Sequence, residues 1–255
     1  MYKTTEITSA EIASDNPVHQ RLLFPYVEAA RLVRGKVLEI GCGWGRGLEL
    51  LTQAADHYTG IDKNDALIQS LRQEYPKSTF IQANIPPLSG LADNTFDYIV
   101  TFQVIEHIQN DDLFVKEAYR VLKPGGTLLL TTVNRLFSLT RNPWHVREYT
   151  AEELKNLLLR YFSTVETQGI HGNGKVMDYY EQNKKSVEKI TRYDVFDLQH
   201  RLPRWMLQVP YDLLNRLNRN KLLEADSLAA EIRHTDYQLT NTPAGSLDFF
   251  YLAKK

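Results

Sequence analysis

Short apolar runs alternate with stretches of helical spacing along most of the chain. Between the runs, stretches such as residues 65–74 and 111–122 place apolar residues three or four positions apart, as amphipathic helices do. The runs themselves predict buried strands at residues 37–40, 58–61, 79–82, 96–101 and 127–132. Strands that alternate with helices in this way predict an α/β fold, with a Rossmann-like parallel sheet covered by helices on both faces.

A helix-capping pattern and two further strand patterns predict the C-terminal part of the sheet. Thr150 and Glu153 form a capping-box signature ahead of an amphipathic helix. Residues 162–168 predict a sixth strand, and residues 247–253, rich in aromatics, predict the last one. The sequence therefore predicts a seven-stranded sheet.

Residues 174–236 differ in character from the rest, being rich in Lys, Arg, Asn and Leu with apolar residues at helical spacing. We expect a helical insert there, which Pro203 and Pro210 break into several helices, because proline disrupts a helix interior. Residues 1–173 and 237–255 then form the cofactor-binding domain. The insert is expected at the acceptor side or at a homodimer interface, and Trp205 and Tyr211 could line a pocket, touch a membrane surface or simply pack.

A glycine-rich turn follows the first strand, with Gly41, Gly43, Gly45 and Gly47 at alternate positions. Ligands bind at the carboxyl ends of parallel strands, where bare glycine backbone allows a close approach. A dinucleotide fingerprint requires a further glycine or alanine at its sixth position, and Arg46 stands there instead. An NAD-dependent oxidoreductase is therefore disfavoured.

Three segments make the chain resemble a class I S-adenosylmethionine-dependent methyltransferase, of the branch that methylates small molecules, quinones or glycans. They are residues 37–47, with the glycine turn; residues 60–62, ending in Asp62; and residues 96–126, which include Glu106-His107 and a Lys-Pro-Gly-Gly turn. The resemblance implies S-adenosylmethionine as cofactor and S-adenosylhomocysteine as product.

The resemblance also implies roles for individual residues. The glycine backbone would lie along the methionine part of the cofactor, Asp62 would hold the ribose, and Gln103 would sit beside the methionyl group. Asn84 stands where many relatives have Asp. The implied cofactor-binding residues are Glu39, Gly41, Cys42, Gly43, Gly45, Asp62, Lys63, Asn84, Ile85 and Gln103.

Two histidines are candidate catalytic residues. Methyl transfer from a sulfonium mainly requires alignment, but a hydroxyl acceptor benefits from a general base, and the pKa of histidine suits that role. His107 follows the fourth strand, and His145 lies in a loop rich in Trp, Arg, Glu and Tyr after the fifth. His19 and Arg21 precede the first strand, on a helix that could close over the cofactor as a lid.

Composition narrows the class of partner. The 30 Lys and Arg residues against 31 Asp and Glu supply no long-range field that attracts nucleic acid, so we expect no DNA as a partner, and RNA is disfavoured. The single cysteine, Cys42, fits a cytoplasmic protein and cannot build a structural zinc site, and no metal site is expected. The chain shows no apolar run long enough for a membrane span.

These observations favour an enzyme that methylates a small-molecule or glycan-like acceptor at oxygen. An RNA or protein methyltransferase, and a regulatory protein that binds the cofactor without catalysis, are the alternatives. The latter predicts a damaged cofactor turn, whereas Glu39, Gly41 and Asp62 are all present.

Overall fold

A computed structural model describes residues 12–194, 197–225 and 228–255, and it has the alternating order of strands and helices that the sequence predicts. The strands are β1 (Lys36–Ile40), β2 (His57–Asp62), β3 (Thr79–Gln82), β4 (Phe96–Phe102), β5 (Leu122–Val133), β6 (Thr164–Gly172), β7 (Tyr237–Thr240) and β8 (Asp248–Lys254). The α-helices are α1 (Asn16–Ala30), α2 (Leu48–Ala54), α3 (Asp65–Glu74), α4 (Asp111–Val121), α5 (Ala151–Leu158), α6 (Gly174–Thr191), α7 (Leu198–Arg201), α8 (Arg204–Ala225) and α9 (Leu228–Glu231).

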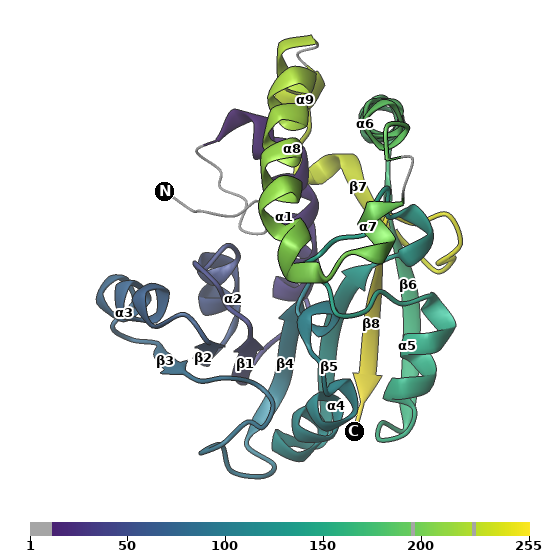
Figure 1. Cartoon of the computed structure of the whole chain (residues 1–255). Coiled ribbons are helices and arrows are strands. Elements are labelled where there is room, and N and C mark those ends of the chain that lie inside the picture. The colour runs from purple at the N-terminus through teal and green to yellow at the C-terminus, as the bar shows by residue number, and fades with distance from the viewer. Residues whose placement is uncertain (1–11, 195–196, 226–227) are drawn as a thin grey trace.

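One sheet runs through the molecule, in the order β3-β2-β1-β4-β5-β8-β6-β7. Strands β1 to β5 are parallel, and β8 inserts antiparallel between β5 and β6. The carboxyl ends of the parallel strands consequently lie along one edge. Figure 1 shows the helices α8 and α9 above that edge.

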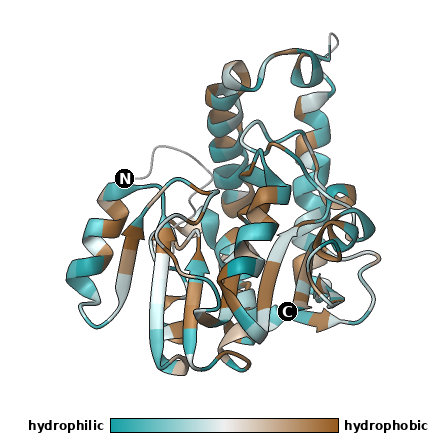
Figure 2. Ribbon diagram, turned by 90° about the horizontal axis from the view of Figure 1, so that it is seen from below, coloured by the Kyte–Doolittle hydropathy of each residue, from teal (hydrophilic) through white to brown (hydrophobic). Residues whose placement is uncertain are grey.

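The apolar side chains of the strands pack against helices on both faces of the sheet. Leu38 and Ile40 of β1 belong to a core with α4 and α5, whereas Val37 points into a second core with α1, α2 and α3. Figure 2 shows hydrophobic residues along several strands, while the helices mix apolar and hydrophilic residues. The predicted capping box is confirmed: the Thr150 side chain accepts from the Glu153 N–H, and the Glu153 carboxyl accepts from the Thr150 N–H.

Two details differ from the sequence-based expectations. Within the described residues the sheet has eight strands rather than seven, because the short edge strand β7, which precedes the last strand in sequence, pairs with β6. Pro203 does separate α7 from α8, but Pro210 lies inside α8 without ending it. Pro210 is exposed, so water can solvate the carbonyl that loses its helical hydrogen bond there.

The helical segment is fastened to the N-terminal part of the chain by buried charges. Asp15, fully buried, accepts hydrogen bonds from Arg216 at 2.8 Å and Arg219 at 2.9 Å, both on α8. Asn16 donates to the carbonyls of Ala229 and Ile232. These contacts hold α8 and α9 over α1 and the adjacent edge of the sheet.

Helix α8 turns polar residues inward and apolar ones outward. Tyr211, Asn215 and Asn218 line a cavity beneath it. The opposite face is an exposed apolar stripe of Trp205, Met206, Val209, Leu213, Leu214 and Leu217. Of the three sequence-based readings of this region, a pocket lining therefore holds for Tyr211 but not for Trp205. No helix within the described residues is long and apolar enough to cross a bilayer.

Candidate active site at the carboxyl edge of the sheet

The glycine turn between β1 and α2 adopts backbone conformations that favour glycine. Gly41, Gly43 and Gly45 have φ values of 83°, 53° and 87°. A side chain on Gly41 would meet Val104 at 2.4 Å, so this glycine lets the turn pack against the loop after β4. At Gly43, by contrast, no atom of the described residues other than the glycine and its two chain neighbours lies within 4 Å of where a Cβ would stand. The turn thus presents bare backbone to open space, as a site for a closely held ligand requires.

Asp62 ends β2 beside this turn. Its Oδ2 accepts from the Gly43 N–H at 2.9 Å and its Oδ1 from the Asn64 N–H at 2.8 Å. Two backbone donors fix the carboxylate, and each oxygen keeps a further lone pair for a ligand hydroxyl. Ala83 donates to the Asp62 carbonyl at 3.0 Å, which brings Asn84 and Ile85 to the same place.

Gln103 follows β4 and shows two signs of a ligand-facing residue. Its φ is 57°, a left-handed conformation that is costly for a residue with a side chain. Its Nε2 is buried and has no hydrogen-bond partner among the described residues. A buried donor without a partner costs about 1–3 kcal/mol, and a bound ligand with an acceptor at this point removes that cost.

Glu39 is buried beneath the turn, and both its carboxyl oxygens are engaged. Tyr26 donates to Oε1 at 2.7 Å and Tyr58 donates a shorter hydrogen bond to Oε2. Burial raises the pKa of Glu39, and the two hydroxyls counteract this. The structure therefore shows Glu39 supporting the turn through α1 and β2. Sequence reasoning missed Tyr26 and Tyr58, because they belong to separate elements and form no local motif.

The other implied cofactor residues differ in exposure. Cys42 is buried, and burial raises the pKa of its thiol. Ile85 is half-buried against the core of α4 and α5, whereas Lys63 and Asn84 are exposed. Lys63 contributes its carbonyl, which accepts from Gln82 at 3.1 Å.

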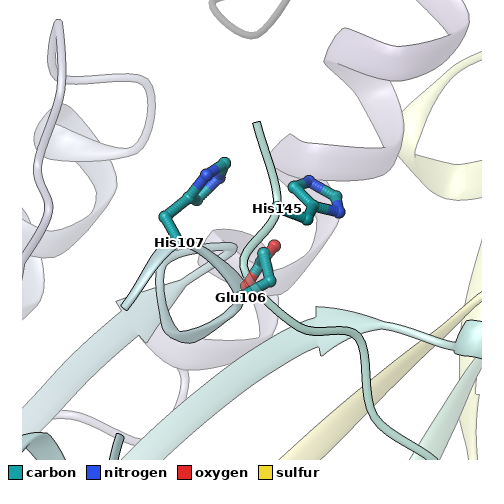
Figure 3. A group of neighbouring side chains, drawn as sticks. All are labelled: Glu106, His107 and His145. Atoms are coloured by element: carbon teal, nitrogen blue, oxygen red, sulfur yellow. The ribbon is translucent and has the colours of Figure 1, made fainter. Parts of the chain in front are cut away.

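The two candidate catalytic histidines lie next to each other. The rings of His107 and His145 meet edge to face, with centroids 4.9 Å apart. Figure 3 shows them with Glu106 above the strand ends, on the loops that follow β4 and β5. The Glu106 carbonyl accepts from the N–H groups of Val146 at 2.7 Å and Arg147 at 3.2 Å, so backbone hydrogen bonds hold the two loops together.

Each imidazole is oriented through Nδ1. His145 Nδ1 lies 2.6 Å from a Glu148 carboxylate oxygen, and His107 Nδ1 lies 3.1 Å from the Trp144 carbonyl. Both partners are acceptors, so each Nδ1 donates, and in the neutral form of each ring Nε2 carries the lone pair. Burial, followed by the nearby His145, lowers the pKa of His107 to about 4. Burial raises the pKa of Glu106 to about 7.

A cavity of about 230 Å³ opens between the sheet edge and the helical segment. His145 and Glu148, from the loop after β5, line it together with Tyr179 and Tyr180 of α6 and Tyr211 of α8. His145 therefore connects the cavity to the loop that carries Gln103 and His107. Sequence reasoning did not identify these tyrosines, because they reach the site only through the packing of α6 and α8 over the sheet.

Helix α1 covers the glycine turn on its outer side. The His19 ring stacks on Trp44 with centroids 6.1 Å apart, and Arg46 donates to His19 Nδ1 at 2.6 Å. Tyr26 closes over Gly47, where a side chain would meet its ring at 1.9 Å. That this helix closes over the cofactor as a lid stays a prediction. The contacts of His19 and Tyr26 with the glycine turn show where α1 docks.

The His19 environment predicts a loss of stability in acid. Burial, and then Arg46, lower the pKa of His19 to about 4. The pKa of His19 in the folded protein lies below its value in the unfolded chain. The stability that the neutral, buried imidazole contributes is therefore present above pH 6.5 and is lost as the pH falls toward 4. Between pH 7.5 and 4.5 the loss amounts to about 2 kcal/mol of unfolding free energy.

Urea unfolding at those two pH values measures this contribution. The variant His19→Gln should lose less stability on acidification than the parent protein, whereas His57→Gln, at an exposed position, should behave like the parent. An equal acid response in the parent and in His19→Gln contradicts the assignment.

Comparison with known proteins gives a consistent result. Residues 38–130 match the family model described as a methyltransferase domain. A probable S-adenosylmethionine-dependent methyltransferase of Mycolicibacterium smegmatis is 38% identical over 179 residues, which cover 67% of this chain and 69% of the relative. A ubiquinone biosynthesis O-methyltransferase of Pseudomonas aeruginosa is 30% identical over 112 residues, covering 42% of this chain and 48% of that protein.

The fold is likewise shared with a solved structure. An S-adenosylmethionine-dependent methyltransferase from Archaeoglobus fulgidus superimposes with a TM-score of 0.55 at 18% identity, covering 93% of each chain. At this identity the similarity establishes the fold, while residue roles rest on the geometry described above.

Proposed function

Because the chain belongs to the S-adenosylmethionine-dependent methyltransferases, we propose that it methylates a hydroxyl oxygen of a neutral small molecule bound in the tyrosine-lined cavity. S-adenosylmethionine is its cofactor. When bound, the cofactor supplies a methyl group carried on a sulfonium sulfur. The acceptor atom would attack the methyl carbon in line with the carbon–sulfur bond, and the sulfur would be the leaving group.

The cofactor is proposed to lie across the ends of β1, β2 and β4. The bare backbone around Gly43 supports placing its methionine part there, and the spare lone pairs of Asp62 suit the two ribose hydroxyls. The buried Nε2 of Gln103 suits an acceptor of the methionyl group. Asn84 and Ile85, beside Asp62, are proposed to flank the adenine.

Replacing Gly43 by alanine should weaken cofactor binding at least about 10-fold, because the new methyl group would occupy the space beside the bare backbone. The left-handed φ of 53° adds a folding cost of about 1–2 kcal/mol. The matched control is Gly90→Ala, which has a φ of 82° and equally open surroundings. Gly90→Ala should show a similar folding cost with unchanged affinity by calorimetry; equal affinity losses in both variants contradict the placement.

The observation that carries the acceptor assignment is the cavity lining, which combines aromatic faces, amides and neutralised charges. Arg21 is paired with Asp248 and Arg219 with Asp15, so the positive charge of each guanidinium is already balanced and does not favour an acidic ligand. The amides include Asn183, Asn215 and Asn218, which can donate to and accept from hydroxyl groups. A neutral molecule with hydroxyl groups and one aromatic or apolar face fits this lining.

The histidines support oxygen as the methylated atom. A hydroxyl is a poor nucleophile until its proton is removed, and His107 and His145 stand where the loops after β4 and β5 meet. We assign to them the task of favouring the deprotonated acceptor oxygen. The similarity to a ubiquinone biosynthesis O-methyltransferase favours the same atom.

The test uses the purified full chain with S-adenosylmethionine labelled in its methyl group. Panels of phenols, quinols and sugars are compared with amines, proteins and RNA, and the products are identified by mass spectrometry. Incorporation at a hydroxyl oxygen is the expected result. Incorporation only at nitrogen, or only into RNA or protein, contradicts the proposal, as does cofactor binding without any transfer.

We further propose that two copies pair through the apolar stripe of α8. Met206, Val209, Leu213 and Leu217 recur at intervals of three and four residues, the spacing of a helix–helix seam, and the stripe contains no charged residue that would repel its own copy. Light scattering should find a dimer, which the double change Val209→Glu and Leu213→Glu dissociates. A monomer at micromolar concentration contradicts this pairing.

A further inference from the structure

Glu106, His107 and His145 form a compact cluster of metal-ligand atoms. One ligand atom from each residue can be chosen so that all three lie within 4.8 Å of one another. Figure 3 shows how the cluster joins two loops: Glu106 and His107 follow β4, and His145 comes from the loop after β5. Since the two loops are bonded through the Glu106 carbonyl, the spacing of the cluster is set by the backbone.

The cluster also has the supporting hydrogen bonds that ligand side chains need. Imidazoles that bind metals usually donate their other N–H to a carboxylate or carbonyl, which fixes the ring and directs the lone pair. His145 has Glu148 in that position and His107 has the Trp144 carbonyl. Glu106 is only 1% exposed, and the Thr132 hydroxyl donates to its Oε2 at 3.0 Å.

We propose that Glu106, His107 and His145 bind a divalent transition-metal cation. Two imidazole nitrogens and one carboxylate oxygen are a ligand set for cations such as Zn²⁺, Mn²⁺ or Fe²⁺, whereas Mg²⁺ and Ca²⁺ prefer oxygen ligands alone. A cation in this place balances the charge of a carboxylate that is otherwise buried at high cost. It replaces the present contact of Asn142 Nδ2 with His145 Nε2 at 2.9 Å.

Such a cation differs from the sequence-based expectation of no metal. That expectation followed from the single cysteine, and it did not consider a site built from two loops, of which one carries Glu106 and His107 and the other His145. The sequence signal that could have suggested it is the adjacent pair Glu106-His107 at a strand end, combined with a second histidine after the next strand.

The cation gives the histidines a defined task, and this step rests on the proposed function. Three protein ligands leave coordination positions open, and His145 lines the acceptor cavity. An acceptor hydroxyl that takes an open position becomes more acidic and loses its proton to water. The oxygen then forms a bond to the methyl carbon as the carbon–sulfur bond breaks, and the sulfur keeps the electron pair as neutral S-adenosylhomocysteine. The charge of the cation is unchanged.

Cation binding is tested on the chelator-treated full chain, without any acceptor. Titration with Co²⁺ should produce visible absorption bands of nitrogen-ligated cobalt, and Zn²⁺ should displace them; Mg²⁺ should not. Glu106→Gln, His107→Ala and His145→Ala should each weaken Co²⁺ binding at least about 10-fold. The control is His200→Ala, an exposed histidine whose Nδ1 lies 2.5 Å from a carboxylate oxygen three residues away, as His145 Nδ1 lies 2.6 Å from one.

The outcomes separate this inference from the proposed function. Absent cobalt bands, or an affinity that none of the three cluster variants changes, overturn the metal site. Failure to methylate any hydroxyl acceptor overturns the proposed function and leaves the cobalt spectrum intact. Methyl transfer that continues at full rate after chelation overturns the role of the cation in preparing the acceptor.

Discussion

Replacing Asp62 by alanine is expected to raise the dissociation constant for S-adenosylmethionine about 100-fold. The change removes both oxygens that we assign to the ribose hydroxyls, and hydrogen bonds to a charged group contribute about 1.5–3 kcal/mol each before partial replacement by water. The carboxylate also holds the N–H groups of Gly43 and Asn64, so the glycine turn loosens as well. Calorimetric titration measures the affinity directly.

Two further variants make the Asp62 result specific. Asp62→Asn keeps one oxygen as an acceptor and should give an intermediate affinity. Asp65→Ala removes a nearby exposed carboxylate that accepts from Gln69 at 2.7 Å, and it should leave the affinity unchanged. An Asp62→Ala protein that folds and binds the cofactor as tightly as the parent contradicts the placement of the ribose.

Replacing His145 by alanine is expected to lower the turnover rate about 100-fold or more, with cofactor affinity unchanged within about twofold. Removal of a group that favours deprotonation of the reacting oxygen typically costs that much. His145 lies in the acceptor cavity beside His107, away from the glycine turn that we assign to the cofactor. Steady-state kinetics and calorimetry separate the two quantities.

His200→Ala is the matched comparison for this change, because it also removes a histidine paired with a carboxylate three residues away but lies outside the cavity lining. It should leave turnover unchanged. If His145→Ala turns over as fast as His200→Ala, then His145 takes no part in preparing the acceptor, and alignment of the two substrates must suffice.

Much of the sheet could be predicted because a buried strand is recognised from a few consecutive residues of the sequence. A parallel strand covered on both faces needs a short apolar run, and β1 and β5 show one. The capping box at Thr150 and Glu153 is equally local, since its hydrogen bonds join residues three apart. The glycine turn could be located because few other residues tolerate its backbone.

The remaining features depend on contacts between distant segments. Strand β7 is only four residues long and gains its place by pairing with β6. Pro210 is tolerated in α8 because the helix is exposed at that point, which no local rule reveals. The support of Glu39 by Tyr26 and Tyr58 likewise joins three elements.

The candidate site also has one part that depends on local sequence and one part that depends on contacts between distant segments. The side that we propose for the cofactor could be located from the sequence, because Gly41 to Gly45 and Asp62 follow consecutive strands. The cavity that we propose for the acceptor could not, since its tyrosines belong to helices whose position over the sheet is set by long-range pairs such as Asp15 with Arg216. Sequence alone therefore identified candidate histidines without the cavity that connects them to an acceptor.

Thermal unfolding with S-adenosylmethionine, S-adenosylhomocysteine and NAD at matched concentrations tests the central claim most directly. A ligand present at 100 times its dissociation constant stabilises the folded protein by about 2.7 kcal/mol. The account predicts that both sulfur compounds raise the melting temperature and that NAD does not. Stabilisation by NAD alone, or by none of the three, would contradict the assignment of the glycine turn and Asp62 to this cofactor.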